Sequence, residues 1–275
     1  SAYNNLTTTE IASVTAAAPV STGNTLPAAT VIGSGGRTPP TQVIDDDTAG
    51  SVEVAAQTTF DPASDGIDFY ESLEGMRVQL NNAVAVGPTN SFGEIPVLVD
   101  GGAGAGIRTA RGGIVINGSP RDFNPERIIV DDLLVSAEPQ VNVGASFPGA
   151  IIGVLDYGFA NYKLLNTAPL PTPTGGVTRE TLSFATRAAS QLDMAAFNVE
   201  NLTPGNGAAR FAALAAIIVD DLKAPDIIAL EEIQDNNGAT NDAVVDATQT
   251  YTTLINAIVT AGGPTYQFRQ SNPQD

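Results

Sequence analysis

Two stretches of sequence decide the fold of the C-terminal part of the chain: residues 193–202 read DMAAFNVENL, and residues 225–235 read PDIIALEEIQD. Each is a short apolar run that ends in polar residues, as expected for a strand that leaves a sheet. Residues 207–223, between them, carry apolar side chains at the spacing of one helix face. A strand–helix–strand unit makes its two strands parallel, with a right-handed crossover. We therefore expect Asn198 and Glu232 to meet at one edge of a sheet.

An amide and a carboxylate at this edge form a plausible half-site for a divalent metal and a phosphate. Ligand sites in open α/β sheets lie beyond the carboxyl ends of the strands. Glu232 offers carboxylate oxygens, which suit a hard cation such as Mg²⁺, and Asn198 can both donate and accept hydrogen bonds. Taken singly, a Glu pair after a strand usually begins a solvated loop, and an isolated Asn usually forms a turn. Asn198 and Glu232 stand at equivalent positions, each at the end of a strand of the same strand–helix–strand unit, and this favours a site. The alternation of the second strand does not tell whether Glu231 or Glu232 points inward.

The composition excludes several chemistries. The 275 residues include 12 basic and 30 acidic side chains, a net charge of −18, with no cysteine and no histidine. A Ser-His-Asp triad, disulfides and cysteine zinc sites are therefore impossible within the chain. Because affinity for nucleic acid on charge alone comes from Lys and Arg, a chain this acidic needs bound metal or high salt to approach a phosphodiester. We expect no membrane span, because no apolar run approaches 18 residues.

Turn signals and composition divide the chain into four parts. We expect the tail of an upstream module and a linker at 1–40, a β-rich accessory module at 41–165, a Pro/Gly linker at 166–190 and an α/β domain at 191–275. Short apolar runs bounded by Gly, Pro, Asn and Asp predict a small barrel or sandwich in the second part. Its expected strands are 76–80, 95–99, 113–116, 127–130, 150–157 and 161–165.

The α/β domain is expected to contain more than the first strand–helix–strand unit. A second helix should follow residues 241–242 and end at Gly262, and Tyr266 and Phe268 alternate with polar residues as in a third strand. Three strands and two helices leave one sheet face and an edge uncovered. We therefore expect 191–275 to be the N-terminal part of an incomplete domain.

Three further acidic segments have ordinary explanations. Residues 45–47, Asp-Asp-Asp, are interpreted as a solvated acidic run. Residues 65–75 are an acidic-aromatic stretch, interpreted as a loop that packs its aromatic side chains, with a metal or interdomain contact as the alternative. Residues 235–242 have the composition of a calcium loop but not the EF-hand spacing, so a polar turn that caps the next helix explains them better.

The quoted stretches resemble a known family. FNVENL at 197–202, followed by PDIIALEEIQD at 225–235, resembles the start of the endonuclease/exonuclease/phosphatase (DNase I-like) superfamily. The upstream segments DFYESLEGM (68–76), PTNSFGE (88–94) and NPERI (124–128) look like the β-rich module that precedes this domain in large secreted bacterial nucleases. The resemblance implies an α+β multidomain chain: an all-β, OB-like barrel or sandwich, then the N-terminal part of a DNase I-like α/β sandwich.

The resemblance also implies a function. It implies a secreted nuclease that hydrolyses phosphodiesters of DNA or RNA with Mg²⁺, or with Mn²⁺ or Ca²⁺ in its place. Asn198 matches the residue that orients the phosphate and the active-site network, and Glu232 matches a metal ligand. The family's Asp-x-Asn and Asp-His pairs find no match here, so we expect this chain to be inactive alone. No signal peptide stands at the start of the sequence, although secretion is implied.

Two alternatives stay open. The first is a phosphatase or phospholipid phosphodiesterase of the same fold, since loops set the substrate. The second is a non-enzymatic secreted β-rich binding protein. The sequence leaves the substrate, the metal, the oligomeric state and the role of the β-rich module undecided.

Overall fold

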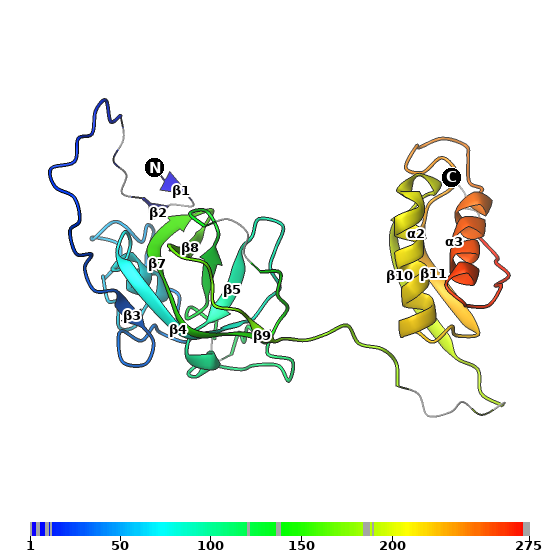
Figure 1. Cartoon of the computed structure of the whole chain (residues 1–275), viewed down its shortest axis with the longest axis horizontal. Helices are drawn as coiled ribbons and strands as arrows, with labels where there is room; N and C mark the ends of the chain where they lie inside the picture. Colours follow the sequence, from blue (N-terminus) through cyan, green and yellow to red (C-terminus); the bar gives the residue numbers. More distant parts are fainter. Residues whose placement is uncertain are drawn as a thin grey trace. The chain divides into compact units, whose positions relative to one another are not determined.

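The chain forms two compact units in the computed structural model, residues 1–178 and 179–275 (Figure 1). We name them the barrel unit and the α/β unit. The structure describes residues 2–3, 6–8, 11, 13–119, 122–135, 139–183, 188 and 190–271. The division between the units falls inside the segment 166–190, where the sequence predicts a linker.

A closed five-stranded β-barrel forms the centre of the barrel unit (Figure 1). Each strand pairs with the next in the order β4-β5-β6-β8-β7, and β7 closes the barrel by pairing with β4. The pairs are antiparallel except β6 with β8, which is parallel. The predicted β-rich character of this region is therefore confirmed. The barrel strands are β4 (Arg77–Ala85), β5 (Ile95–Leu98), β6 (Ile128–Asp131), β7 (Ala145–Gly158) and β8 (Asn161–Asn166).

The barrel core takes side chains from every strand and from one short helix. Alternate residues along the strands point inward, as the pleat requires, and include Val78, Ile95 and Phe147, all fully buried. Helix α1 (Gly66–Glu71) adds Phe69 and Tyr70 to this core. Its segment was predicted as a loop with packed aromatic side chains: the packing is confirmed, but the backbone is helical. A 3₁₀ turn, η1 (Asp100–Gly102), follows β5.

Three sequence predictions for the barrel unit are wrong. The strand at 113–116 is absent, because Ile114 makes only an isolated bridge with Arg108 across a tight turn. Strand β3 (Thr30–Ile32) pairs parallel with β4, so part of the segment 1–40, predicted as the tail of an upstream module and a linker, contributes to the barrel sheet. Strand β9 (Thr174–Gly175) pairs with β7, so the start of the predicted linker at 166–190 also belongs to that sheet. Both strands are too short to show alternation, and their partners are distant in sequence. A further short pair, β1 (Ala2–Tyr3) and β2 (Leu6–Thr7), lies near the N-terminus.

The α/β unit has a parallel strand pair with two helices on one face. β10 (Met194–Leu202) pairs with β11 (Ile227–Ile233), and between them a 3₁₀ turn, η2 (Pro204–Asn206), leads into α2. Helix α2 (Gly207–Ala216) ends in one π-helical turn, η3 (Ile217–Asp221), and α3 (Thr248–Thr260) follows β11. Figure 1 shows α2 and α3 side by side. No helix among the described residues is long and apolar enough to cross a membrane.

The core of the α/β unit lies between this helix pair and one face of the sheet. It includes Val199 from β10, Phe211 and Leu214 from α2 and Leu254 from α3. The opposite sheet face is exposed: Met194 is 73% accessible. The prediction of one uncovered sheet face is therefore confirmed.

The predicted third strand around Tyr266 and Phe268 is absent, because the backbone of 263–271 forms no ladder. Side chains hold this segment instead. The Tyr266 hydroxyl donates to the Pro225 carbonyl oxygen at 2.5 Å, and the Phe268 ring stacks on Tyr251 at 4.7 Å between centroids. The alternation of aromatic and polar residues therefore reflects side chains that anchor an extended segment, and it does not indicate a strand.

Candidate metal and phosphate site

The candidate site lies where β10 and β11 end together. The strands run in register up to Asn198 and Glu231, and they pair again at Leu202 and Ile233. Between these pairs β10 has three residues and β11 has only Glu232, which is a β-bulge. Three non-glycine residues here have left-handed backbone, with φ of 56° at Glu200, 53° at Asn201 and 61° at Glu232. This conformation is uncommon for residues with a side chain, and such residues often cluster at functional sites.

The bulge brings the two predicted site residues into contact. Asn198 Nδ2 donates a hydrogen bond to Glu232 Oε1 at 2.7 Å. Asn198 Oδ1 in turn accepts from the Glu200 backbone N–H at 2.8 Å. Both ends of the amide are therefore engaged, and its donor end is fixed toward the carboxylate. The structure places Asn198 and Glu232 at one edge of the sheet, as the strand–helix–strand argument predicts.

Glu232, not Glu231, is the oriented member of the acidic pair. Its Oε2 accepts from the Asn201 backbone N–H at 3.2 Å, so each carboxylate oxygen has one donor. The Glu231 side chain is exposed and has no hydrogen-bond or ion-pair partner among the described residues. The left-handed backbone at Glu232 interrupts the alternation of β11, which explains why the sequence pattern could not choose between the two.

Residues that were not predicted support the bulge. Gln234 Nε2 donates to Asn201 Oδ1 at 2.8 Å. Arg210, in the first turn of α2, pairs with Glu200 at 2.8 Å and donates to the Val199 carbonyl oxygen at 3.2 Å. The quoted stretches contain all of these residues except Arg210, but no spacing rule assigns them a role. They fix the backbone that presents Glu232.

The geometry suits a cation that keeps most of its ligands as water or phosphate. Glu232 is exposed, and each of its oxygens retains lone pairs beyond those used by Asn198 and Asn201. Mg²⁺ is commonly held by one or two carboxylates, with waters and substrate phosphates completing the octahedron. Among the described residues, Glu232 is not part of any group of three or more carboxylates spaced to hold a metal ion. Asn198 Nδ2 is committed to Glu232, so we assign Asn198 the role of positioning that carboxylate.

Carboxylate groups with metal-binding spacing do occur in the barrel unit. They involve Asp45, Asp47, Asp61, Asp65 and Asp68. The sequence pattern predicts a solvated run for the first two and a packed loop for the last two. Their proximity arises from tertiary contacts, so no spacing in the sequence indicates it.

Comparison with known protein families gives one match, and it covers most of the barrel unit. Residues 31–175, just over half of the chain, match the family described as "Domain of unknown function (DUF8508)". The chain therefore belongs to this family, and the match extends from β3 to β9 and includes the closed barrel. No curated protein and no solved structure matches the chain. The Asn198–Glu232 corner lies outside the matched residues.

Proposed function

We propose that the α/β unit carries a metal-binding corner of a phosphodiesterase of the endonuclease/exonuclease/phosphatase, DNase I-like type. The observation that carries the proposal is the 2.7 Å hydrogen bond from Asn198 Nδ2 to Glu232 Oε1 at the carboxyl ends of two parallel strands. The residues that resemble the superfamily motifs are the residues that meet in this contact. A merely solvated Glu pair after a strand gives no reason for a bulge with three left-handed residues.

The division of roles follows from the hydrogen bonds. Glu232 would hold the cation, which we propose to be Mg²⁺, with Mn²⁺ or Ca²⁺ as substitutes. A bound ion of this kind polarises a phosphate ester and stabilises the departing oxygen. Asn198 fixes the direction of the carboxylate, and Asn201 N–H holds its second oxygen. The left-handed backbone keeps Glu232 at the rim of the sheet, where a phosphate can approach from solvent.

The proposed substrate class is nucleic acid, DNA or RNA, and the protein is proposed to act outside the cell. Both points rest on the resemblance of residues 197–202 and 225–235 to the nuclease motifs. Phosphomonoesters and phospholipids are the competing substrates for the same fold. Since loops outside this corner set the substrate, substrate assays decide among them.

The closed barrel is proposed to be OB-like. In its favour, the five strands follow the order β4-β5-β6-β8-β7 and close on β4, as in a small five-stranded Greek-key barrel. Five of its described cations are already engaged by other protein groups. Arg37 donates to Ser72, Arg77 to the Pro27 carbonyl, Arg108 to the Gly101 and Gly112 carbonyls, and Arg127 to Asn161, while Lys163 is buried against Glu94 and Asp131. We therefore do not assign nucleic-acid binding to this barrel on charge.

Metal binding at the corner can be tested on the chain itself. Paramagnetic Mn²⁺, titrated into ¹⁵N-labelled protein, should broaden the Asn198 side-chain NH₂ and the Asn201 backbone amide selectively. Glu232→Gln should abolish this broadening, whereas Glu231→Gln, which removes the same charge one residue away, should retain it. Equal broadening in all three proteins would remove Glu232 from the proposal.

Hydrolysis needs groups that this corner does not supply. No histidine exists in the sequence, and among the described residues Glu232 belongs to no group of three or more acidic side chains spaced to hold a metal ion. The 275-residue chain, assayed with Mg²⁺ on DNA, RNA, phospholipid and phosphomonoester, should therefore be inactive. Metal-dependent cleavage by the purified chain would contradict this expectation. A protein that joins this unit to the remaining superfamily groups should cleave DNA, and Asn198→Ala there should lower activity by about 10–100-fold, as for residues that position a metal ligand.

A further inference from the structure

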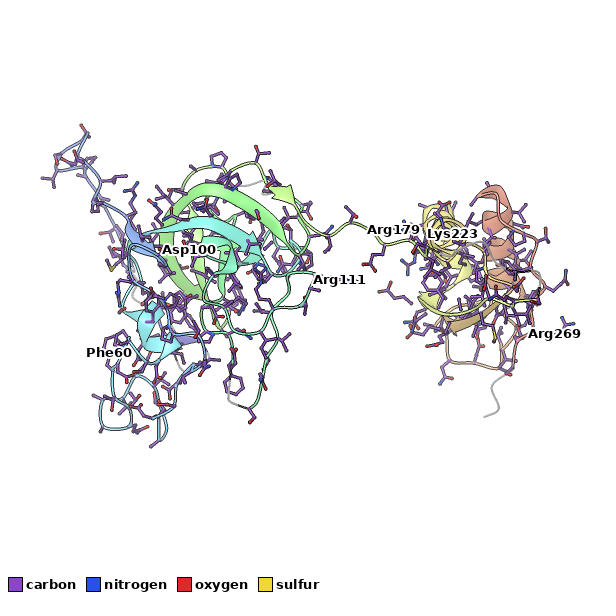
Figure 2. The ribbon with its side chains drawn as sticks, turned by 90° about the horizontal axis from the view of Figure 1, so that it is seen from below. Phe60, Asp100, Arg111, Arg179, Lys223 and Arg269 are labelled. Atoms are coloured by element: carbon purple, nitrogen blue, oxygen red, sulfur yellow. The ribbon has the colours of Figure 1, made fainter. Side chains whose placement is uncertain are left out.

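Four aspartates of the barrel unit converge on a fifth, Asp65, whose side chain is buried. Asp45, Asp47 and Asp65 form one group, and Asp61, Asp65 and Asp68 form another; in each group one carboxylate oxygen per residue lies within 4.8 Å of the others. Asp65 belongs to both groups. We call these five residues the Asp65 cluster. The loop that supplies three of them includes Phe60, which is labelled in Figure 2.

The shared carboxylate is buried without a partner for one of its oxygens. Asp65 is 1% exposed, and its Oδ1 has no hydrogen-bond partner. Its Oδ2 accepts only a long bond, 3.4 Å, from the Asp46 backbone N–H. Asp61 Oδ1 is also buried and unpartnered. A buried carboxylate needs a counter-charge or full hydrogen bonding to offset its desolvation.

No basic side chain in the described ranges supplies that counter-charge. Among the described residues, no Lys or Arg pairs with any of the five carboxylates. Burial raises the pKa of Asp65 to about 6, and the charges of Asp61, Asp46 and Asp45 act in the same direction. Burial also raises the pKa of Asp68, which is 2% exposed. These shifts agree with the geometry: the cluster brings carboxylates together, and no basic side chain in the described part of the chain neutralises them.

The carboxylates are held in place by the fold. The backbone N–H groups of Gly66 and Ile67 donate to the carbonyls of Val43 and Ile44, at 3.1 and 3.0 Å, and tie the loop to α1. Asp68 Oδ2 accepts from the Asp61 backbone N–H at 2.8 Å. Helix α1 is itself anchored by Phe69 and Tyr70 in the barrel core. The positions of Asp65 and Asp68 are therefore set by packing and backbone hydrogen bonds, which hold the carboxylates together against their mutual repulsion.

The outer aspartates are oriented by threonines. Thr48 Oγ1 donates to Asp45 Oδ2 at 2.7 Å, and Asp47 Oδ1 accepts from Thr58 Oγ1 at 3.0 Å and from the Thr59 backbone N–H at 3.2 Å. Asp45 Oδ2 and Asp47 Oδ2, which accepts only a long bond of 3.3 Å from Thr59 N–H, each keep a lone pair for a cation. One group thus includes the exposed Asp47, and the other includes the buried Asp68.

We propose that the Asp65 cluster binds Ca²⁺, with Asp65 as the ligand common to both groups. Ca²⁺ accepts six to eight oxygen ligands in flexible geometry, and carboxylates bind it through one oxygen or two. Mg²⁺ requires a stricter octahedron and gives up its waters reluctantly, so a cage of several protein carboxylates favours Ca²⁺. Such a site would fasten the 45–61 loop to α1, and through α1 to the barrel core.

Calcium titration of the full chain tests the site. Isothermal titration with Ca²⁺ should give saturable binding with a Kd in the range of about 10⁻⁶ to 10⁻⁴ M, and Mg²⁺ should bind at least tenfold more weakly. Ca²⁺ at about 100 times its Kd should raise the melting temperature of the barrel unit by roughly 5–10 °C relative to EDTA. No saturable Ca²⁺ binding by the wild-type chain would overturn the proposal.

Two variants and a matched control locate the binding. Asp65→Asn should abolish both the titration and the Ca²⁺-dependent shift, yet melt in EDTA at or above the wild-type temperature, because it removes an uncompensated buried charge. If Asp65→Asn does not fold, Asp47→Asn at the exposed rim serves instead and should weaken binding at least tenfold. Glu53→Gln removes an exposed acid of the same loop and should bind like wild type. Wild-type affinity in Asp65→Asn or in Asp47→Asn would contradict the assignment.

Discussion

The two units differ in the burial and the hydrogen bonding of their most distinctive carboxylates. The barrel unit closes on itself and buries Asp65 and Glu126, each with little or no donor support. The α/β unit leaves one sheet face open and exposes Glu232, yet gives each of its oxygens a donor. An exposed carboxylate needs no partner to be stable, so two donors indicate that its direction matters. A buried carboxylate without partners indicates instead that a proton or a cation belongs beside it.

Core truncation should show the largest contrast between the units. Phe147→Ala removes a fully buried side chain of the barrel and should lower its free energy of unfolding by about 3–5 kcal/mol. Leu254→Ala, at 1% exposure in the α/β unit, should cost about 2–5 kcal/mol there. Native-state hydrogen exchange reports each unit separately, and Phe92→Ala, at 78% exposure, should change neither. If Phe147→Ala loosened both units equally, they would not be independent cores.

The buried Glu126 should make barrel stability depend on pH. Burial raises its pKa to about 7 from an ordinary value of 4.5, and the Asp122 charge adds to this; the nearby Arg127 is paired with Asn161. Between pH 4.5 and 7 the folded protein therefore holds a proton that the unfolded chain has released. Stability should fall as pH rises through this window, by at most about 3 kcal/mol.

Urea unfolding in EDTA at pH 5 and pH 8 measures how the free energy of unfolding of the barrel changes with pH. Glu126→Gln should reduce the loss of stability between the two values, because it stays neutral throughout. Glu232→Gln, in the exposed site, should leave the pH dependence of the barrel unchanged. A wild-type barrel that is more stable at pH 8 than at pH 5 would contradict the sign.

At a left-handed residue outside the site, substitution by glycine should increase stability. Lys223, labelled in Figure 2, has φ of 59° just after the π-helical turn that ends α2. Lys223→Gly should stabilise the α/β unit by about 1 kcal/mol, since glycine adopts this backbone without steric cost. Ala212→Gly, on the exposed face of α2, should destabilise it by a similar amount. Chemical denaturation measures both, and a destabilising Lys223→Gly would show that its side chain contributes more than the backbone costs.

The smallest effect is expected at the site itself. Glu232→Gln keeps the shape of the side chain and weakens two exposed hydrogen bonds, so it should cost only about 0.5 kcal/mol of stability. Glu231→Gln, without partners among the described residues, should cost none. A loss of several kcal/mol in Glu232→Gln would mean that the carboxylate is a structural element of the sheet edge and would favour the non-enzymatic alternative.

Where sequence reasoning succeeded, the pattern was local. The periodicities of 193–202, 207–223 and 225–235 are contiguous and joined by one crossover, so they specify both the parallel pair and the meeting of Asn198 with Glu232. The resemblance singled out Glu232 over Glu231, which alternation could not do. The barrel strands were also visible, although β7 begins five residues before its predicted start, at Ala145, across a proline and a glycine.

Where it failed, the relevant contacts were tertiary. Strands β3 and β9 are two or three residues long and owe their existence to distant partners. The segment around Tyr266 alternates because its aromatic rings are anchored, not because its backbone pairs. The Asp65 cluster joins Asp45 and Asp47, the loop residue Asp61, and two aspartates at the start of a short helix, and no spacing rule links them. Asp65 differs from the solvated aspartates nearby because its side chain is buried, and the sequence does not show which aspartate is buried.

The most direct test of the central claim is an anomalous difference map from a crystal of the chain soaked in Mn²⁺. The account predicts a peak in coordinating contact with the Glu232 carboxylate, with Asn198 Nδ2 still donating to it, and no such peak in Glu232→Gln. Manganese density elsewhere in the protein, with none at Glu232 at saturating concentration, would contradict it.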